Sequence, residues 1–191
     1  MRELEDKILA EGTVLPGNVL KVAHFLNQQI DVPFMQKMGD EVARLYRDAG
    51  ITKVLTIEAS GIAFGYATAL ALGVPLVFAK KHRSSNLTGE LLTASVFSYT
   101  HQETYNIAVS KSYISSDDVV LIVDDFLAMG NAIIGLKDLI EQAGATLAGA
   151  AVAIEKGFQN GGDHLRTQGI RIESLAIVDS MTDNNLTFRQ N

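Results

Sequence analysis

Two adjacent carboxylates, Asp124 and Asp125, follow an apolar run over residues 119–123 in the stretch VVLIVDDFLAMGNA. The apolar run is typical of a buried strand, so we expect both acids at the strand's end, just before a loop and a helix. Adjacent strand residues point to opposite faces, but a turn into the loop can bring both acids to the rim. Carboxylates there can bind magnesium, hold sugar hydroxyls or simply cap the next helix.

A turn of small or compact residues follows the acids, over residues 128–132. Backbone N–H groups at the start of a helix suit a phosphate group. Amides gripping a phosphate and acids gripping hydroxyls would together hold a sugar phosphate. The alternative is an ordinary capped turn between a strand and a helix, where aspartate is common.

Elsewhere, continuous apolar strands alternate with amphipathic helices, which predicts an α/β fold with a mostly parallel central sheet and helices on both faces. We expect a single domain over residues 1–191. Three strand ends carry polar residues, at 58–61, 124–125 and 155–156, where parallel sheets bind ligands. The expected helices cover residues 3–11, 34–49, 62–72 and 130–143. The expected strands cover residues 53–58, 76–81, 119–123, 147–156 and 170–178. A hairpin or flap is expected from residues 93–97 and 105–109, and residues 14–32 are not assigned.

Composition excludes several classes of function. The formal net charge of −6 argues against a nucleic-acid surface, and the absence of cysteine excludes disulfides, thiolate nucleophiles and zinc–thiolate sites. The charged start, MRELEDKILAEG, is not a secretory signal, so we expect a cytoplasmic protein. Residues 57–79 are long enough to span a bilayer, but Glu58 and Gly73–Pro75 divide them into a strand end, a helix and a second strand, so no membrane association is expected.

Several competing motifs are missing from the sequence. It contains no G-x-x-x-x-G-K-[ST] phosphate loop, no G-x-G-x-x-G after a strand and no G-x-S-x-G elbow. The four histidines are scattered without the spacing of metal ligands. Nucleotide hydrolysis by a P-loop, dinucleotide binding and serine hydrolysis are therefore disfavoured.

The stretch VLIVDDFLAMGNA resembles the phosphoribosyl-diphosphate signature of type I phosphoribosyltransferases. Where the commoner form has threonines, this chain has Met129 and Ala132, which resembles the xanthine phosphoribosyltransferase branch. Met129 stands where that branch commonly has asparagine, which changes a side chain but leaves the backbone amides. The same branch is matched by EGTVLPGNVLKVAHFLNQQID, ITKVLTIEASGIA, GVPLVFAKKH, NLTGELLTASVFS and AIEKGFQ, nearly the whole chain in order.

The resemblance implies that xanthine and 5-phosphoribosyl 1-diphosphate (PRPP) give xanthosine 5′-monophosphate and diphosphate in purine salvage. It further implies Mg²⁺ as cofactor, a homodimer, and the type I phosphoribosyltransferase fold. That fold would add a flexible flap and a small base-binding hood from residues 1–35 and about 156–191. The magnesium is expected to be held mainly through diphosphate and ribose, with no dedicated protein ligand.

The resemblance also assigns roles to residues. Asp124 and Asp125 would face the ribose hydroxyls and favour the positive charge that develops at C1′. A basic run from Lys80 to Arg83 would close over diphosphate, although such runs are usually solvated. The alternative for Glu58 is a structural cap. The residues implied for PRPP binding are Ala128, Met129, Gly130, Asn131 and Ala132 at the 5′-phosphate, and Glu58, Ser60, Gly61 and Lys81 at the diphosphate.

For the base, the resemblance points to Leu20, Asn27 and Lys156. Asn27 can donate to the C2 carbonyl of xanthine and the Lys156 ammonium to its C6 carbonyl, while Leu20 would form an apolar wall. Taken alone, a lysine such as Lys156 is more often solvated, and a leucine such as Leu20 is more often a core residue. Phe158 could stack on the base or pack in the core.

Other functions stay open at this point. The same chemistry could serve guanine or hypoxanthine, because a few hydrogen bonds in the hood decide the base. A transcriptional regulator that binds PRPP would carry a winged-helix domain before this fold, whereas the motifs here begin close to the first residue. An α/β protein whose acid pair has no catalytic role would leave the three polar strand ends unexplained.

Overall fold

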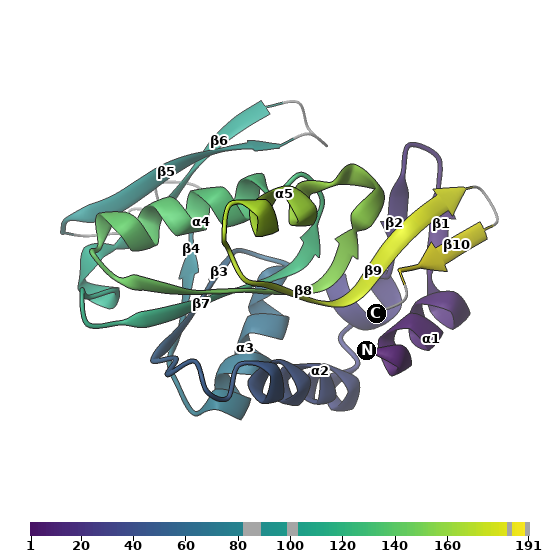
Figure 1. Cartoon of the computed structure of the whole chain (residues 1–191), viewed down its shortest axis with the longest axis horizontal. Coiled ribbons are helices and arrows are strands. Elements are labelled where there is room, and N and C mark those ends of the chain that lie inside the picture. The colour runs from purple at the N-terminus through teal and green to yellow at the C-terminus, as the bar shows by residue number, and fades with distance from the viewer. Residues whose placement is uncertain (82–88, 99–102, 183–184, 190–191) are drawn as a thin grey trace.

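The computed structural model describes residues 1–81, 89–98, 103–182 and 185–189, and its centre is a six-stranded sheet (Figure 1). The strand order is β10-β9-β8-β7-β3-β4, and all neighbours are parallel except β10, which runs antiparallel to β9. The predicted mostly parallel sheet is therefore confirmed. Its strands are β3 (Lys53–Ile57), β4 (Leu76–Ala79), β7 (Val119–Leu127), β8 (Thr146–Lys156), β9 (Ile172–Thr182) and β10 (Asn185–Phe188).

Helices cover both faces of the sheet, as the alternation of strands and helices predicted. Along β7, Leu121 and Val123 belong to one apolar core and Val120 and Ile122 to another, because successive strand residues face opposite sides. The first core packs against α2 (Val32–Leu45) and α3 (Gly61–Leu72), and the second against α4 (Asn131–Gln142). Gly73, in the left-handed conformation, ends α3, so residues 57–79 divide as expected, and none of the described helices combines the length and apolarity needed to cross a bilayer.

One end of the molecule is built from both ends of the chain. Helix α1 (Arg2–Glu11), the short hairpin β1 (Thr13–Leu15) and β2 (Val19–Lys21), and a π-helical turn (Ala23–Asn27) lie beside β10 and the end of β9 (Figure 1). The C-terminal elements β10 and α5 (Gly161–Thr167) have no counterpart among the predicted elements. A helix of seven residues with two glycines is too short to show a periodic pattern.

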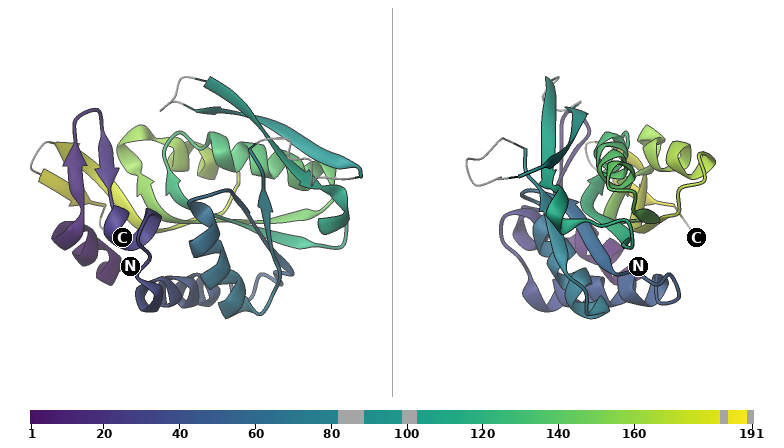
Figure 2. Two further views of the ribbon diagram at one scale, coloured as in Figure 1. Left: turned by 180° about the vertical axis from the view of Figure 1, so that it is seen from behind. Right: turned by 90° about the vertical axis from the view of Figure 1, so that its left-hand side faces the viewer.

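The predicted hairpin is present and longer than expected. Strands β5 (Leu91–Ser98) and β6 (Glu103–Ser110) pair antiparallel and stand out from the sheet, as the second view in Figure 2 shows. Its inner face packs on α4 so closely that a methyl group on Gly135 would lie 2.5 Å from Val96 Cγ2. An isolated bridge between Lys80 and Ala108 joins the hairpin to the chain after β4. Short 3₁₀ turns cover Lys111–Tyr113 and Gly157–Gln159.

Candidate active site

The two acids lie inside β7 and not after it, so the prediction that the strand ends at Val123 was wrong. The pairing with β8 continues through Asp124, opposite Val152, to Leu127, because β8 is long enough to supply partners. The pairing of β7 with β3 stops at Ile122. Beyond that residue the β3 side of β7 carries no ladder, which leaves the acids at an open edge where a ligand can approach.

The two carboxylates point toward different neighbours. Asp124 lies beside the start of α3, where a methyl group on Gly61 would come 3.0 Å from Asp124 Oδ1 and 2.2 Å from Thr56 Oγ1. Asp125 Oδ2 accepts a hydrogen bond from Asn27 Nδ2 of the π-helical turn. The Asp125 backbone N–H donates to Asp124 Oδ1 at 3.0 Å. The pair therefore links the β3–α3 loop to the N-terminal segment.

Both acids are nearly buried, with 8% and 7% of their surfaces exposed. Burial raises the pKa of Asp124 well above its usual range, and the neighbouring charge of Asp125 raises it further, while Lys81 acts in the opposite direction. A bound cation would favour the ionised form of Asp124. Mg²⁺ commonly takes one or two carboxylates and completes its shell with phosphate oxygens and water, so the two acids fit an ion that arrives with a diphosphate substrate. No cluster of three or more potential ligand side chains occurs among residues 1–81, 89–98, 103–182 and 185–189.

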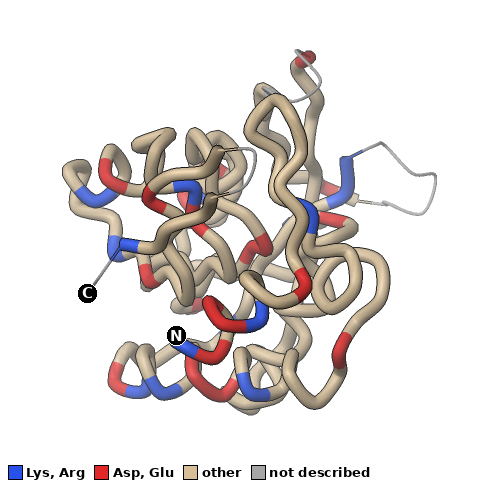
Figure 3. Tube along the Cα trace, turned by 90° about the vertical axis from the view of Figure 1, so that its right-hand side faces the viewer, with Lys and Arg blue, Asp and Glu red and all other residues tan. Residues whose placement is uncertain are grey.

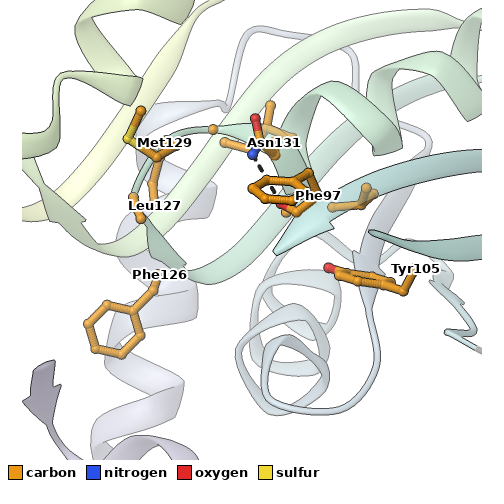
Figure 4. Close-up of a pocket in the computed structure, with 11 residues that line it drawn as sticks. Phe97, Tyr105, Phe126, Leu127, Met129 and Asn131 are labelled. Atoms are coloured by element: carbon orange, nitrogen blue, oxygen red, sulfur yellow. Dashed lines mark hydrogen bonds between the residues drawn. The ribbon is translucent and has the colours of Figure 1, made fainter. Parts of the chain in front are cut away.

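The turn after β7 has the backbone geometry of an anion site. Gly130 is the N-cap of α4 with φ +88°, and no side chain caps the helix, so neither acid serves as its cap. The first N–H groups of α4 have no partner within the helix and can bind a phosphate. A cavity of about 130 Å³ lies over this turn, which we name the phosphate loop (residues 128–132), and is closed on its other side by Val96, Phe97 and Tyr105 of the hairpin (Figure 4).

A hydrogen bond ties the phosphate loop to the hairpin. Asn131 Nδ2 donates to the backbone oxygen of Phe97 at 3.0 Å, as the dashed line in Figure 4 shows. Met129, on the same loop, is 40% exposed. Burial raises the pKa of Tyr105, across the cavity, and the charge of Asp124 adds to the effect. The hairpin thus forms one wall of the same site as the acids.

The β3–α3 loop holds the predicted diphosphate residues next to Lys81. Glu58 Oε1 accepts a hydrogen bond from the backbone N–H of Lys81 at 2.8 Å, just after the end of β4. The Glu58 carboxylate therefore satisfies a backbone donor, which agrees with the alternative that it is a structural cap. Ser60 is the N-cap of α3, without a side-chain hydrogen bond, and Gly61 begins the helix. The Lys81 ammonium lies 5.2 Å from the centre of the Tyr105 ring. The neighbouring basic residues His82 and Arg83 fall outside the described residues.

Of the three residues predicted to bind the base, two face the acids or their strand. Asn27 contacts Asp125, and the Lys156 ammonium lies 5.8 Å from the centre of the Phe126 ring while donating to the backbone oxygen of Asn18 at 2.9 Å. Burial lowers the pKa of Lys156, so it is not a freely solvated lysine. Leu20, only 6% exposed, belongs to the apolar core, against which Phe158 also packs.

Two site features have no counterpart in the sequence predictions. Tyr105 lies on a strand without any motif, and the contact between Asn27 and Asp125 joins residues 98 positions apart. The β1–β2 hairpin that supplies Asn18 could have been found, because Pro16-Gly17-Asn18 is typical of a turn. Both Gly17 and Asn18 have positive φ values, as tight turns require.

Comparison with known proteins defines the class to which this fold and site belong. The family described as phosphoribosyl transferase domain matches residues 29–177, and the chain is therefore a member of the phosphoribosyltransferase family. Among solved structures, adenine phosphoribosyltransferase from Leishmania tarentolae superposes with a TM-score of 0.76 at 20% identity, covering 95% of this chain and 90% of that one. The enzyme from Giardia lamblia gives 0.74 at 24% identity, covering 93% and 98%. These two likenesses confirm the fold.

Full-length relatives share a more particular name. Xanthine phosphoribosyltransferase from Oceanobacillus iheyensis is 50% identical, covering 100% of this chain and 98% of its own. The protein of the same name from Heliobacterium modesticaldum is 53% identical, covering 98% of this chain and 100% of its own. The resemblance to the xanthine phosphoribosyltransferase branch is thereby confirmed over the whole sequence.

Proposed function

We propose that this protein transfers the 5-phosphoribosyl group of PRPP to N9 of xanthine, giving xanthosine 5′-monophosphate and diphosphate in purine salvage. The observation that carries the proposal is the position of Asp124 and Asp125, between the phosphate loop and the two polar base candidates, Asn27 and Lys156. Full-length relatives of that name at about half identity support the same assignment.

In the proposed reaction the backbone amides of the phosphate loop bind the 5′-phosphate. Asp124 and Asp125 hold the ribose hydroxyls and stabilise the positive charge that develops at C1′. Backbone amides of the loop that contains Glu58, Ser60 and Gly61, together with Lys81, bind the diphosphate at the other side of Asp124. Asp124 and Asp125 lie where they would adjoin a Mg²⁺ ion carried mainly by the diphosphate and ribose, and the bound ion would supply positive charge to the leaving group.

The hood supplies base recognition in this proposal, with residues 1–35 and about 156–191 contributing to it. The Asn27 amide has two N–H donors, and Asp125 accepts one of them. The second N–H can donate to the C2 carbonyl of xanthine. The Lys156 ammonium has three, of which one goes to Asn18, and it can reach the C6 carbonyl. Leu20 forms the apolar wall behind them.

We further propose that the protein is a cytoplasmic homodimer. An apolar groove of about 750 Å³ lies along α2, α3 and β4, and two of its aromatic residues are exposed: Tyr66 by 62% and Phe78 by 40%. The groove includes Ala59 of the β3–α3 loop, where diphosphate is proposed to bind, so a second copy bound in the groove would contact the active site. Sedimentation of the wild type and of Tyr66→Asp tests this proposal: a dimer that the variant weakens is expected, and a wild-type monomer at micromolar concentration would contradict it.

The catalytic proposal is tested by product analysis. Purified protein, PRPP, Mg²⁺ and xanthine should yield xanthosine 5′-monophosphate and diphosphate in equal amounts by mass spectrometry and a diphosphate assay. Diphosphate release without nucleotide would point to hydrolysis of PRPP and would contradict the assignment.

A further inference from the structure

An ion pair between a fully buried carboxylate and a partly exposed arginine lies next to Lys156 of the proposed site. Glu155, fully buried, precedes Lys156 at the end of β8, and its carboxylate accepts two hydrogen bonds from Arg166 of α5, at 2.9 Å and 2.7 Å. Ser174 of β9 donates to the same carboxylate. A paired, fully satisfied charge in this position fixes geometry on both elements that it joins.

The same arginine continues into a charge network at the C-terminal end of the chain. Arg166 also donates to Asp163 Oδ1 at 3.1 Å, and Arg189 donates to both oxygens of Asp163 at 3.0 Å and 3.1 Å. Figure 3 shows acidic and basic residues interspersed along this part of the trace. Helix α5 is thereby held to β8 and to the last described segment by charges on several elements.

Helix α5 in turn packs against the phosphate loop. A methyl group on Gly161 would lie 2.1 Å from the backbone oxygen of Ala128, so the two backbones are in direct contact. Leu165, fully buried, lies beneath Gly130, whose added methyl group would come 2.9 Å from Leu165 Cδ1. The phosphate loop therefore has α5 as its supporting surface, and α5 has the Glu155–Arg166 pair as its anchor.

We infer that Arg166 and Glu155 are positioning residues that hold the 5′-phosphate loop in its binding geometry through α5. This inference rests on the proposed function. The pair touches no substrate; it acts through the contacts of Gly161 and Leu165 with the loop. Losing the two parallel hydrogen bonds lets α5 shift, and small displacements of a positioning group cost up to about 100-fold in reactions that depend on orientation.

Two variants separate positioning from stability. Arg166→Lys keeps the charge but cannot form the parallel pair of hydrogen bonds. The double variant Glu155→Met/Arg166→Met removes both charges together, so that the buried Glu155 site holds no unpaired carboxylate, and such apolar replacement of a buried charge with its partner is often neutral or stabilising. Arg44→Met is the control, because it removes an arginine that forms an exposed ion pair with Glu41 on α2, away from the site.

We expect Arg166→Lys and the double variant to raise the KM for PRPP about tenfold, with kcat changed less than about threefold. The double variant should keep the wild-type melting temperature, and Arg44→Met should leave both kinetic constants unchanged. A double variant with wild-type stability and a wild-type KM for PRPP would overturn the inference, since the phosphate loop would then keep its binding geometry without the ion pair.

Ribose 5-phosphate affinity, measured by calorimetry on the same proteins, keeps this test apart from that of the proposed function. A wild type that forms no nucleotide from any base, yet binds ribose 5-phosphate more tightly than both variants, would refute the proposed function and leave the positioning role standing. Equal ribose 5-phosphate affinities in all four proteins would refute the positioning role.

Discussion

Gly130→Ala is the substitution that probes the phosphate loop most sharply. Gly130 has φ +88°, and an L-residue in the left-handed region costs about 1–2 kcal/mol. The new methyl group would also lie 2.9 Å from Leu165 Cδ1, shorter than the 3.4–4 Å of ordinary contact. Because Leu165 is fully buried, making room costs about 1–3 kcal/mol more. The sum is about 2–5 kcal/mol.

That cost can appear in two places. A loop that keeps its shape lowers the free energy of unfolding by the full amount, and a loop that shifts spares stability but loses the alignment of its amides with the phosphate. Denaturant unfolding and the KM for PRPP, measured on the same preparation, capture both. We expect a loss of at least about 2 kcal/mol, or a rise in KM of about tenfold or more, or a division of the cost between them.

Gly50→Ala is the matched control. Gly50 also has a positive φ, +63°, but nothing lies within 4 Å of the position that a methyl group would take. This variant should lose about 1 kcal/mol of stability with unchanged KM for PRPP. If Gly130→Ala matched it in both quantities, the tight packing of the loop on α5 and its role in binding PRPP would both be refuted.

Three further predictions concern the acids, the base and pH. Asp124→Asn should reduce kcat about 100-fold. The free energy of unfolding should fall by less than about 1 kcal/mol or should rise, because burial disfavours the ionised carboxylate that the amide replaces. Parallel losses of turnover and stability would contradict a catalytic role. Lys156→Ala should raise the KM for xanthine about tenfold or more with little change in PRPP affinity, since one charged hydrogen bond is worth about 1.5–3 kcal/mol, and a defect confined to PRPP would contradict the base assignment. Asp118 lies at the opposite end of the sheet, where burial raises its pKa, but hydrogen bonds from Lys53, the Ser115 backbone and Thr52 outweigh burial and lower the pKa from 3.8 to about 2. The stability that the ionised carboxylate contributes is therefore complete above about pH 4 and is lost as pH falls toward 2. In an acid titration of the free energy of unfolding, Asp118→Asn should lack this loss.

The convergence of the polar strand ends was predictable from the sequence. Residues 58–61 follow β3, whereas residues 124–125 and 155–156 lie within the carboxyl-terminal parts of β7 and β8. The three strands are neighbours in the sheet, and parallel strands carry their carboxyl ends to one edge. The end of β7 was not predictable, because two aspartates look like a strand's end and only the length of β8 keeps them in the ladder.

Interactions between distant segments account for most of what the sequence could not show. The Asn27–Asp125 contact and the Glu155–Arg166 pair join side chains from different elements, and no local sequence pattern indicates either pairing. The short strands β1 and β2 have three residues each, too few for a period-two pattern. They are stabilised by packing of Val14 and Leu20 on the apolar core. Such elements form because the fold around them supplies partners, not because their own residues prefer the conformation.

The most direct measurement is the specificity constant, kcat/KM, for xanthine, guanine, hypoxanthine and adenine with saturating PRPP and Mg²⁺. Asn27 and Lys156 offer donors to carbonyl oxygens, and xanthine carries a carbonyl at C2, whereas guanine has an amino group there and hypoxanthine only a hydrogen. We predict that xanthine exceeds each of the other bases by at least about tenfold, the value of a single well-placed hydrogen bond. Equal or higher values for guanine, hypoxanthine or adenine would contradict the proposed recognition of the base.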